Sequence, residues 1–241
     1  MVAPASTGRD DEPAITVVIP VLNDTAALAS LLPALAGDPT LEIIVVDGSG
    51  ASDPALDVLR ERHSAVRWMR SAPGRGAQMN YGARHARGRW LVFLHSDTRL
   101  GLSWIDVLHR LDQQPQIVGG SFRFVLDSPA RWARWIEWGV RIRVRLFDLA
   151  YGDQALFVRR TIFEELQGYR ELPLMEDVDF IRRLRRHGQL EHADVPAVTS
   201  ARRWEQDGWF RRSLYNALLV ALFLAGYSPE HLARRYFRVR K

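Results

Sequence analysis

The sequence predicts an α/β fold with a doubly wound, mostly parallel sheet. Two observations carry this prediction: short β-branched apolar runs alternate with amphipathic helical segments over the first hundred residues, and polar side chains follow the ends of those runs. Continuous apolar runs are typical of parallel strands that are buried on both faces. Because crossovers between parallel strands are right-handed, helices cover both faces and ligands bind beyond the carboxyl ends of the strands.

Each element of the first half follows from its local pattern. Residues 15–20 form a β-branched run that ends in a proline, and leucines at helical spacing predict a helix over 24–35. The same alternation predicts further strands and helices, in the order strand 41–46, helix 54–62, strand 66–69, helix 76–86 and strand 90–94.

Beyond residue 100 the pattern indicates a mixed α+β half followed by C-terminal helices. The predicted elements are helix 104–111, strand 119–126, strand 155–158, helix 176–187 and helix 208–225. Ser228 and Pro229 favour one last helix, because serine caps a helix N-terminus and proline fits its first turn.

Composition excludes several classes of protein. The chain has 241 residues, 47% of them hydrophobic, which suits one globular domain with a substantial core. It has no cysteine, so disulfides and thiolate metal sites are excluded and a reducing compartment is favoured. Lys241 is the only lysine, which excludes P-loop and Schiff-base lysine chemistry. The net charge of +5 therefore comes from arginine, which suits contact with an anionic partner.

The chain shows neither a secretory signal nor a run that crosses a bilayer. Residues 1–13 are small, polar and acidic, and we expect them to form a disordered tail. The longest apolar run, near residues 214–227, is shorter than the roughly 20 residues that a bilayer requires. We therefore expect a cytoplasmic protein, either free or peripheral at the inner face of the membrane.

Polar residues gather where the predicted strands end. Asn23 and Asp24 follow the first strand, Asp47 follows the second and Asp97 follows the fourth. One such aspartate alone is better explained as a helix cap or turn residue. Three carboxylates and an amide at one sheet edge favour a nucleotide site. The basic, glycine-rich segment around Arg75 lacks a dinucleotide fingerprint, so it is either a phosphate contact or a plain turn.

These motifs resemble those of the inverting family 2 glycosyltransferases, which have the GT-A fold. Pro20, Asn23 and Asp24 stand in the family's Pro-x-x-Asn-Glu pattern, with aspartate in place of glutamate. Asp47 and Ser49 match the second-strand motif, whose aspartate contacts the base and ribose of a sugar nucleotide. The resemblance implies that these five residues bind a nucleoside diphosphate sugar donor.

The segment His95, Ser96 and Asp97 stands where the family has its metal-binding Asp-x-Asp motif. The resemblance implies that Asp97 binds a divalent ion, Mn or Mg, which offsets charge on the leaving diphosphate. His95 replaces the first aspartate. It is a second metal ligand, a ribose or water contact, or a structural histidine.

Further motifs resemble the subgroup of arsenosugar-biosynthesis or selenodomain-associated glycosyltransferases, over about residues 14–237. They are the segments 74–80, 93–98, 152–154 and 175–177. The implied donor contacts within them are Arg75, Gln78, Asn80, Gly152 and Asp153. The resemblance also implies one GT-A domain over 14–241, with a nucleotide-binding half (14–100), an acceptor half (101–210) and C-terminal helices (211–241).

Inversion at a sugar carbon requires a general base on the face opposite the leaving group. The resemblance makes Asp177 that base, with Glu176 beside it at a helix start. The alternative is that these acids only stabilise the N-terminus of the helix through its dipole. Arg203 and Trp204 resemble the Arg-Trp end of a motif of processive members, and imply diphosphate binding and stacking. The alternative for this pair is a solvated arginine next to a core tryptophan.

The segment 131–147 places three tryptophans at a spacing of three among arginines. We interpret it as a helix whose tryptophans face the core and whose arginines face water. Three alternatives remain open: contact with an anionic membrane, a mobile lid over the acceptor, or a homodimer contact.

The function expected from these residues and the resemblance is metal-dependent, inverting transfer of a sugar to a hydroxyl of a small or lipid-linked acceptor. One competing hypothesis is a non-catalytic protein that binds a membrane or nucleic acid and keeps a vestigial nucleotide site. Recognised nucleic-acid motifs are absent, so we expect no nucleic-acid partner. A nucleotidyltransferase is disfavoured further, since the first strand lacks a glycine-rich, lysine-containing loop.

Overall fold

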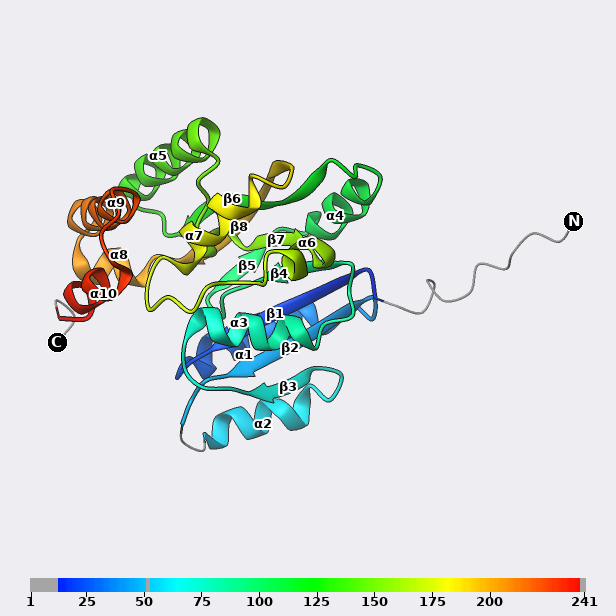
Figure 1. Ribbon diagram of the computed structural model, residues 1–241. Coiled ribbons are helices and arrows are strands. Elements are labelled where there is room, and N and C mark those ends of the chain that lie inside the picture. Colours follow the sequence, from blue (N-terminus) through cyan, green and yellow to red (C-terminus); the bar gives the residue numbers. More distant parts are fainter. Residues whose placement is uncertain (1–12, 51–52, 239–241) are drawn as a thin grey trace, which may run out of the picture.

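An eight-stranded sheet forms the centre of the computed structural model (Figure 1), which describes residues 13–50 and 53–238. The predicted tail, residues 1–13, lies outside the described residues except for Pro13. In chain order the strands are β1 (Ile15–Val21), β2 (Leu41–Asp47), β3 (Arg67–Arg70), β4 (Trp90–Phe93), β5 (Thr98–Leu100), β6 (Ile117–Asp127), β7 (Leu156–Arg159) and β8 (Gln189–Ser200).

Helices surround this sheet. They are α1 (Thr25–Leu35), α2 (Pro54–Arg62), α3 (Arg75–Arg84), α4 (Trp104–Asp112), α5 (Arg131–Phe147), the 3-10 turn η1 (Gly152–Gln154), α6 (Arg160–Glu165), α7 (Glu176–Leu184), α8 (Arg202–Asp207), α9 (Trp209–Leu224) and α10 (Pro229–Arg238). No helix in the described ranges is long and apolar enough to span a membrane.

The strand order is β3-β2-β1-β4-β7-β6-β8-β5, and its first four strands are parallel. Strand β7 runs antiparallel to both β4 and β6, whereas β6 and β8 are parallel. Buried leucines of α1, α2 and α4 pack on one face of the sheet, and apolar residues of α3, α7 and α9 pack on the other. The predicted doubly wound, mostly parallel fold with a mixed second half is therefore confirmed.

The interpretation of the tryptophans in segment 131–147 is wrong. The segment is helical, as α5, but Trp132, Trp135 and Trp138 are 48%, 63% and 56% exposed. The buried residues of α5 are the small Ala133 and Val144. Because bulky rings stand on the outer side, α5 presents an apolar surface to its surroundings instead of contributing tryptophans to the core.

A buried carboxylate ties the start of the sheet together. Glu42 of β2 accepts a hydrogen bond from the Thr16 hydroxyl at 2.6 Å and one from the Arg87 N–H at 2.7 Å. Its other oxygen pairs with Arg67 at 2.5 Å. Burial raises the pKa of Glu42, but these hydrogen bonds outweigh burial and hold its pKa below the usual range.

We expect Glu42→Gln to lower the free energy of unfolding by about 2 kcal/mol at pH 7, because a charged acceptor in a buried network is lost. Since the pKa is depressed in the folded protein, this stabilisation is present above a pH of about 4.3 and is lost as the pH falls towards the folded pKa. Urea unfolding at pH 7 and at pH 3 measures both effects, with the exposed Glu61→Gln as control. Equal stability of Glu42→Gln and wild type at pH 7 would contradict this account.

Candidate functional site

Two connected cavities form one cleft at the carboxyl ends of β1 and β4. The outer cavity is lined by Pro20, Asp24 and Ser96, together with residues from the starts of α3 and α7. The inner cavity reaches Asp153 and Asp177. The shared residues of the two cavities are Arg75, His95, Asp97, Leu174, Arg203 and Tyr236. The cleft therefore extends from the end of β1 to the start of α7.

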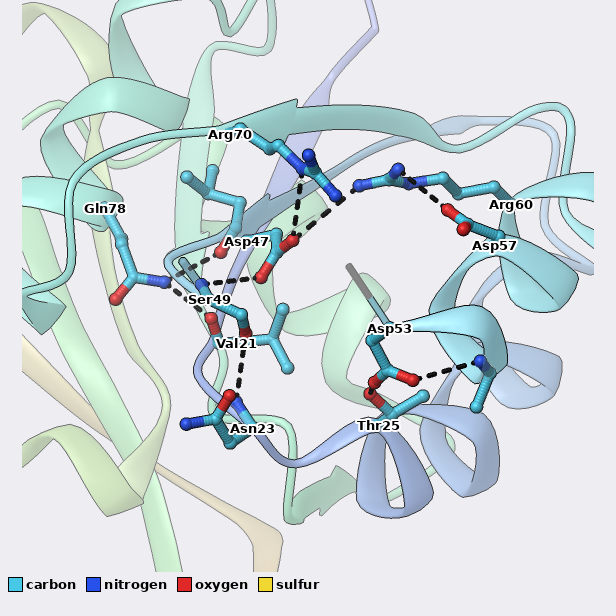
Figure 2. A network of polar contacts seen from close by, with 12 residues as sticks. Val21, Asn23, Thr25, Asp47, Ser49, Asp53, Asp57, Arg60, Arg70 and Gln78 are labelled. Carbon is cyan, nitrogen blue, oxygen red and sulfur yellow. Dashed lines mark hydrogen bonds and ion pairs between the residues drawn. The ribbon is translucent and has the colours of Figure 1, made fainter. Parts of the chain in front are cut away.

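Asp47 lies at the end of β2 in the polar network of Figure 2. It is 1% exposed, and its Oδ1 accepts a hydrogen bond from the Ser49 N–H at 2.8 Å. Arg70 Nε and Arg60 Nη2 lie 3.5 and 3.8 Å from Oδ2. This oxygen has no hydrogen-bond partner among the residues that the structure describes. Asp47 therefore lies beside the cleft, with its Oδ2 atom held only by two long ion pairs.

Backbone geometry sets the loops around Asp47. Asn23 adopts a left-handed backbone, with φ of 53°, which asparagine tolerates better than most residues. Its N–H donates to the Ser49 hydroxyl at 3.2 Å, so the ends of β1 and β2 are linked. The buried Gln78 amide donates to the carbonyls of Val21 and Val46, each at 2.8 Å (Figure 2). Gln78 thus reaches the outer cavity but acts mainly in holding the two strand ends.

Several predicted donor contacts line neither cavity of the cleft: Asn23, Asp47, Ser49, Asn80 and Gly152. Asn80 is held by the loop before α7. Its amide donates to the Tyr169 carbonyl and accepts from the Tyr169 N–H, both at 2.8 Å. Neither cavity of the cleft is lined by Asn80. These hydrogen bonds link α3 to the segment before α7, so Asn80 holds this part of the cleft in place without lining it.

Carboxylates crowd around the inner cavity. Burial raises the pKa of Asp97, and Asp24 adds to this effect while Arg203 opposes it. Burial also raises the pKa of Asp153 to about 6, helped by Asp177 and Asp97 and opposed by Arg143 and Arg75. The Oδ1 atom of Asp153 is buried and has no hydrogen-bond partner in the described part of the chain. Negative charge at this point is therefore incompletely compensated.

His95 lies among these groups in its neutral form. Burial lowers its pKa well below the usual value, and the positive charges of Arg75 and Arg203 lower it further. Its Nε2 atom is buried and makes no hydrogen bond within residues 13–50 and 53–238. A neutral imidazole with an unused ring nitrogen is available to a ligand, which fits the predicted place of His95 in the site.

The two acids at the start of α7 have different partners. Met175 takes a left-handed backbone, with φ of 68°, and this sharp turn starts the helix at the cleft. Glu176 forms a close ion pair with Arg75. Asp177 instead accepts hydrogen bonds from the N–H groups of Gly152 and Val178, each at 2.8 Å, and lines the inner cavity. Glu176 is therefore the acid that pairs closely with Arg75, whereas two backbone N–H groups hold Asp177 at the inner cavity.

Arg203 and Trp204 of α8 take separate positions. Arg203 is exposed and lines both cavities, close enough to Asp97 and His95 to affect their pKa values. Trp204 is 9% exposed, donates its indole N–H to Ser213 at 3.2 Å and packs against Phe124. Arg203 thus fits a phosphate contact, whereas Trp204 forms part of the wall and of a small core.

Sequence reasoning missed several residues of the inner cavity. They come from the segment before η1 and from the C-terminal helices, and they are Tyr151, Arg212, Asn216 and Tyr236. Arg143 stacks on the Tyr151 ring, with its guanidinium carbon 3.4 Å from the ring centre. Of these residues, Asn216 alone carries a signal in the sequence, because it is a polar side chain within an apolar stretch of helix.

A comparison with known families decides between the classes of function. The family model described as glycosyl transferase family 2 matches residues 16–173, well over half of the chain. The chain belongs to glycosyltransferase family 2. The predicted enzyme class is thereby confirmed at the level of the family. No curated protein sequence matches this glycosyltransferase.

Solved structures of two other glycosyltransferases share the fold. TarS from S. aureus, in complex with UDP-GlcNAc, matches with a TM-score of 0.56 and 15% identity over 77% of this chain. The mannosyltransferase PcManGT from Pyrobaculum calidifontis, in complex with GDP-Man and Mn²⁺, matches with a TM-score of 0.60 and 17% identity over 95% of this chain. The chain spans 58% of the TarS chain and 68% of PcManGT. At these identities the likeness shows the fold, and the GT-A prediction is confirmed.

Close contact at Gly152 makes the glycosyltransferase sensitive to one added methyl group. A Cβ at Gly152 would lie 2.9 Å from His95 Nε2 and 3.4 Å from Asp177 Oδ2. We expect Gly152→Ala to displace His95 and to lower kcat by at least about tenfold, because small misplacements of reacting groups are costly. Steady-state kinetics and the melting temperature of the variant check this prediction.

Gly37→Ala is the matched control for this substitution, because its added Cβ meets only the Pro33 carbonyl at 3.9 Å. It should leave kcat unchanged. Wild-type kcat in a folded Gly152→Ala variant would show that the contact with His95 has no catalytic consequence.

Proposed function

We propose that this glycosyltransferase moves a sugar from a nucleoside diphosphate sugar to an acceptor hydroxyl, with inversion at the anomeric carbon and with a divalent metal, Mn or Mg. The observation that carries the proposal is the cleft, which joins a cationic and carboxylate centre at Arg75, Arg203 and Asp97 to the acid Asp177. Sugar transfer requires such an arrangement, because the diphosphate of the donor needs cationic groups and the hydroxyl of the acceptor needs a nearby base.

The outer cavity suits the nucleotide. We assign Asp47, which lies beside the outer cavity and whose Oδ2 atom faces Arg60 and Arg70, to the base or ribose of the donor, with Ser49 and Asn23 holding the surrounding loop. Arg75 and Arg203 line the route from this cavity to the inner one and supply positive charge for a diphosphate.

The residues of the cleft fit a divalent ion that is shared with a diphosphate. Asp97 and Asp153 are crowded carboxylates with raised pKa values, and His95 is neutral with an unused Nε2 atom. Among the described residues no group of three or more acids and histidines is placed to hold a metal alone. Asp97 and His95 would therefore hold the ion together with donor oxygens, as Mg²⁺ and Mn²⁺ sites commonly do. When bound, the ion would offset negative charge on the leaving diphosphate.

Asp177 is the proposed general base. The acceptor oxygen forms a bond to the anomeric carbon while its proton passes to Asp177. The bond between the anomeric carbon and the diphosphate oxygen breaks, and the nucleoside diphosphate leaves with the electron pair. Glu176 positions Arg75 through their ion pair, and Gly152 holds Asp177 through its N–H group.

The motifs at 74–80, 93–98, 152–154 and 175–177 support the further proposal that the chain belongs to the arsenosugar-biosynthesis or selenodomain-associated subgroup of family 2.

Release of nucleoside diphosphate from UDP-, GDP- and CDP-sugars, measured with Mn²⁺ and with Mg²⁺ against a panel of hydroxyl acceptors, tests this proposal. One donor should react, and NMR of the product should show an anomeric configuration opposite to that of the donor. Retained configuration would refute the direct inversion with Asp177 as base. Turnover of none of the donors would refute the proposed donor class.

A further inference from the structure

An apolar groove lies between α5 and α9. The two helices run side by side in Figure 1 and contact one another. The walls of the groove carry Trp132, Trp135, Ile136, Val140, Trp209 and Phe210. The rings of Trp132 and Phe210 meet edge to face at 4.6 Å and join the two walls. The groove has a volume of about 420 Å³, which is large enough for a hydrocarbon chain of many carbons.

The groove adjoins the inner cavity of the cleft. Tyr151, Asp153, Trp204 and Asn216 line both spaces, so only these shared side chains stand between the groove and the cavity. A molecule whose apolar part lies in the groove therefore has its other end close to Asp153 and to the proposed base. This continuity points to a substrate of the transfer reaction and not to an unrelated ligand.

Charge around the groove favours an anionic head group. Helix α5 carries five arginines and a single acid, Glu137. Within the inner cavity, Arg212 is 7% exposed. Its Nη1 atom pairs with Asp207 at 3.0 Å and its Nη2 atom donates to the Tyr236 hydroxyl at 2.6 Å, whereas its Nε atom has no hydrogen-bond partner in the described part of the chain. A buried guanidinium donor without a partner is costly unless a ligand accepts its hydrogen bond. An anionic group at the cavity end of the groove would supply that acceptor.

We propose that the groove between α5 and α9 binds the hydrocarbon chain of a lipid acceptor, whose anionic head lies in the inner cavity near Arg212. This inference rests on the proposed sugar transfer and narrows its acceptor to one class. Trp135 and Trp138 of α5 and Leu214 of α9 are exposed, and with the arginines of α5 they place apolar and cationic groups on neighbouring helices, a combination that suits the surface of an anionic bilayer.

A second copy of the chain fits this surface less well. Tryptophan and arginine are both common in protein interfaces, so the composition of α5 does not distinguish a second copy from a lipid. A copy seated in the groove would, however, cover the side of the inner cavity that adjoins the groove, where the acceptor has to enter. The experiment therefore has to distinguish dimer formation from lipid binding.

Gly139 offers a way to fill the groove without disturbing the fold. It lines the groove, and a Cβ added there meets no atom within 4 Å. Leucine forms helix better than glycine does, so Gly139→Leu should fold at least as well as wild type. Gly139→Ala is the matched control, since it gives a similar helix benefit but leaves most of the groove open.

The probes are butyl, octyl and dodecyl phosphate, each used below the concentration at which it forms micelles. Their binding is followed through the fluorescence of the groove tryptophans. We expect wild type and Gly139→Ala to bind more tightly as the chain lengthens, by about fourfold for each methylene group buried. In Gly139→Leu this dependence on chain length should be lost.

Binding of nucleoside diphosphates, measured by thermal shift, separates failure of this inference from failure of the proposed function. If nucleotides bind and chain length has no effect in wild type, the groove inference is overturned and the proposed function stands. Unchanged chain-length dependence in Gly139→Leu would also overturn the groove inference. A dimer in sedimentation that Gly139→Leu breaks, without alkyl phosphate binding, would assign the groove to a second copy. If no nucleotide binds, the proposed function itself fails.

Discussion

Replacing Asp177 by asparagine is expected to lower the rate of sugar transfer by about 10³-fold, the usual range for loss of a general base. Asparagine keeps the size of the side chain, and one oxygen still accepts the hydrogen bond from Gly152 or from Val178. Nucleotide binding and the melting temperature should therefore change little. Initial rates with saturating donor, together with thermal unfolding, measure the two effects separately.

Asp179→Asn distinguishes catalysis from a simple effect of the helix dipole. Asp179 also lies in the first turn of α7, but it pairs with Arg170 and Arg183 and lines neither cavity of the cleft. We expect this control to lower stability, since it breaks a network of ion pairs, and to leave kcat near that of wild type. If Asp177→Asn folds and keeps more than a tenth of the activity, Asp177 is not the base.

Asp97→Asn is expected to lower turnover by at least about 10²-fold at any concentration of Mn²⁺ or Mg²⁺. The reason is loss of the carboxylate that we assign to the ion and the diphosphate, a contribution worth several kcal/mol in metal-assisted reactions. A chelator should reduce wild-type activity by a similar factor and should add little to the effect of the variant. Titration of activity with each metal, in wild type and in Asp97→Asn, checks both statements.

The control for this variant is Asp106→Asn, an exposed carboxylate in the first turn of α4. It removes the same charge away from the cleft, so it should leave the metal titration unchanged. Wild-type activity of Asp97→Asn, or full activity of the wild type in the presence of chelator, would contradict the assigned metal site.

The first half of the fold could be predicted because its signals are local. Strands β1 and β2 are continuous apolar runs, and α1 has leucines at helical spacing. The pattern that identifies each element therefore lies within the element itself. The carboxylates at the strand ends follow from the same reasoning. Asp24 and Asp97 both line the outer cavity, since the parallel strands that precede them end at one edge of the sheet.

The second half depends on contacts between distant segments. Strand β8 was not predicted, because its partners β6 and β5 lie far away in the sequence and it contains His192, Asp194 and Pro196. The outward tryptophans of α5 were misjudged because periodicity identifies the apolar side of a helix but not what that side faces. Likewise the position of Asn80 follows from Tyr169, a residue 89 positions further along the chain.

The measurement that tests the central claim most directly is thermal stability against UDP, GDP, CDP and their sugars, for wild type and for Asp97→Ala. Each ligand is tested with Mn²⁺, with Mg²⁺ and with chelator. At a hundred times the dissociation constant, binding adds about 2.7 kcal/mol, which raises the midpoint of a chain of this size by about 5–10 °C. We predict a metal-dependent rise with one nucleotide that Asp97→Ala abolishes. No rise with any nucleotide, or an equal rise in Asp97→Ala, would contradict a donor site at this cleft.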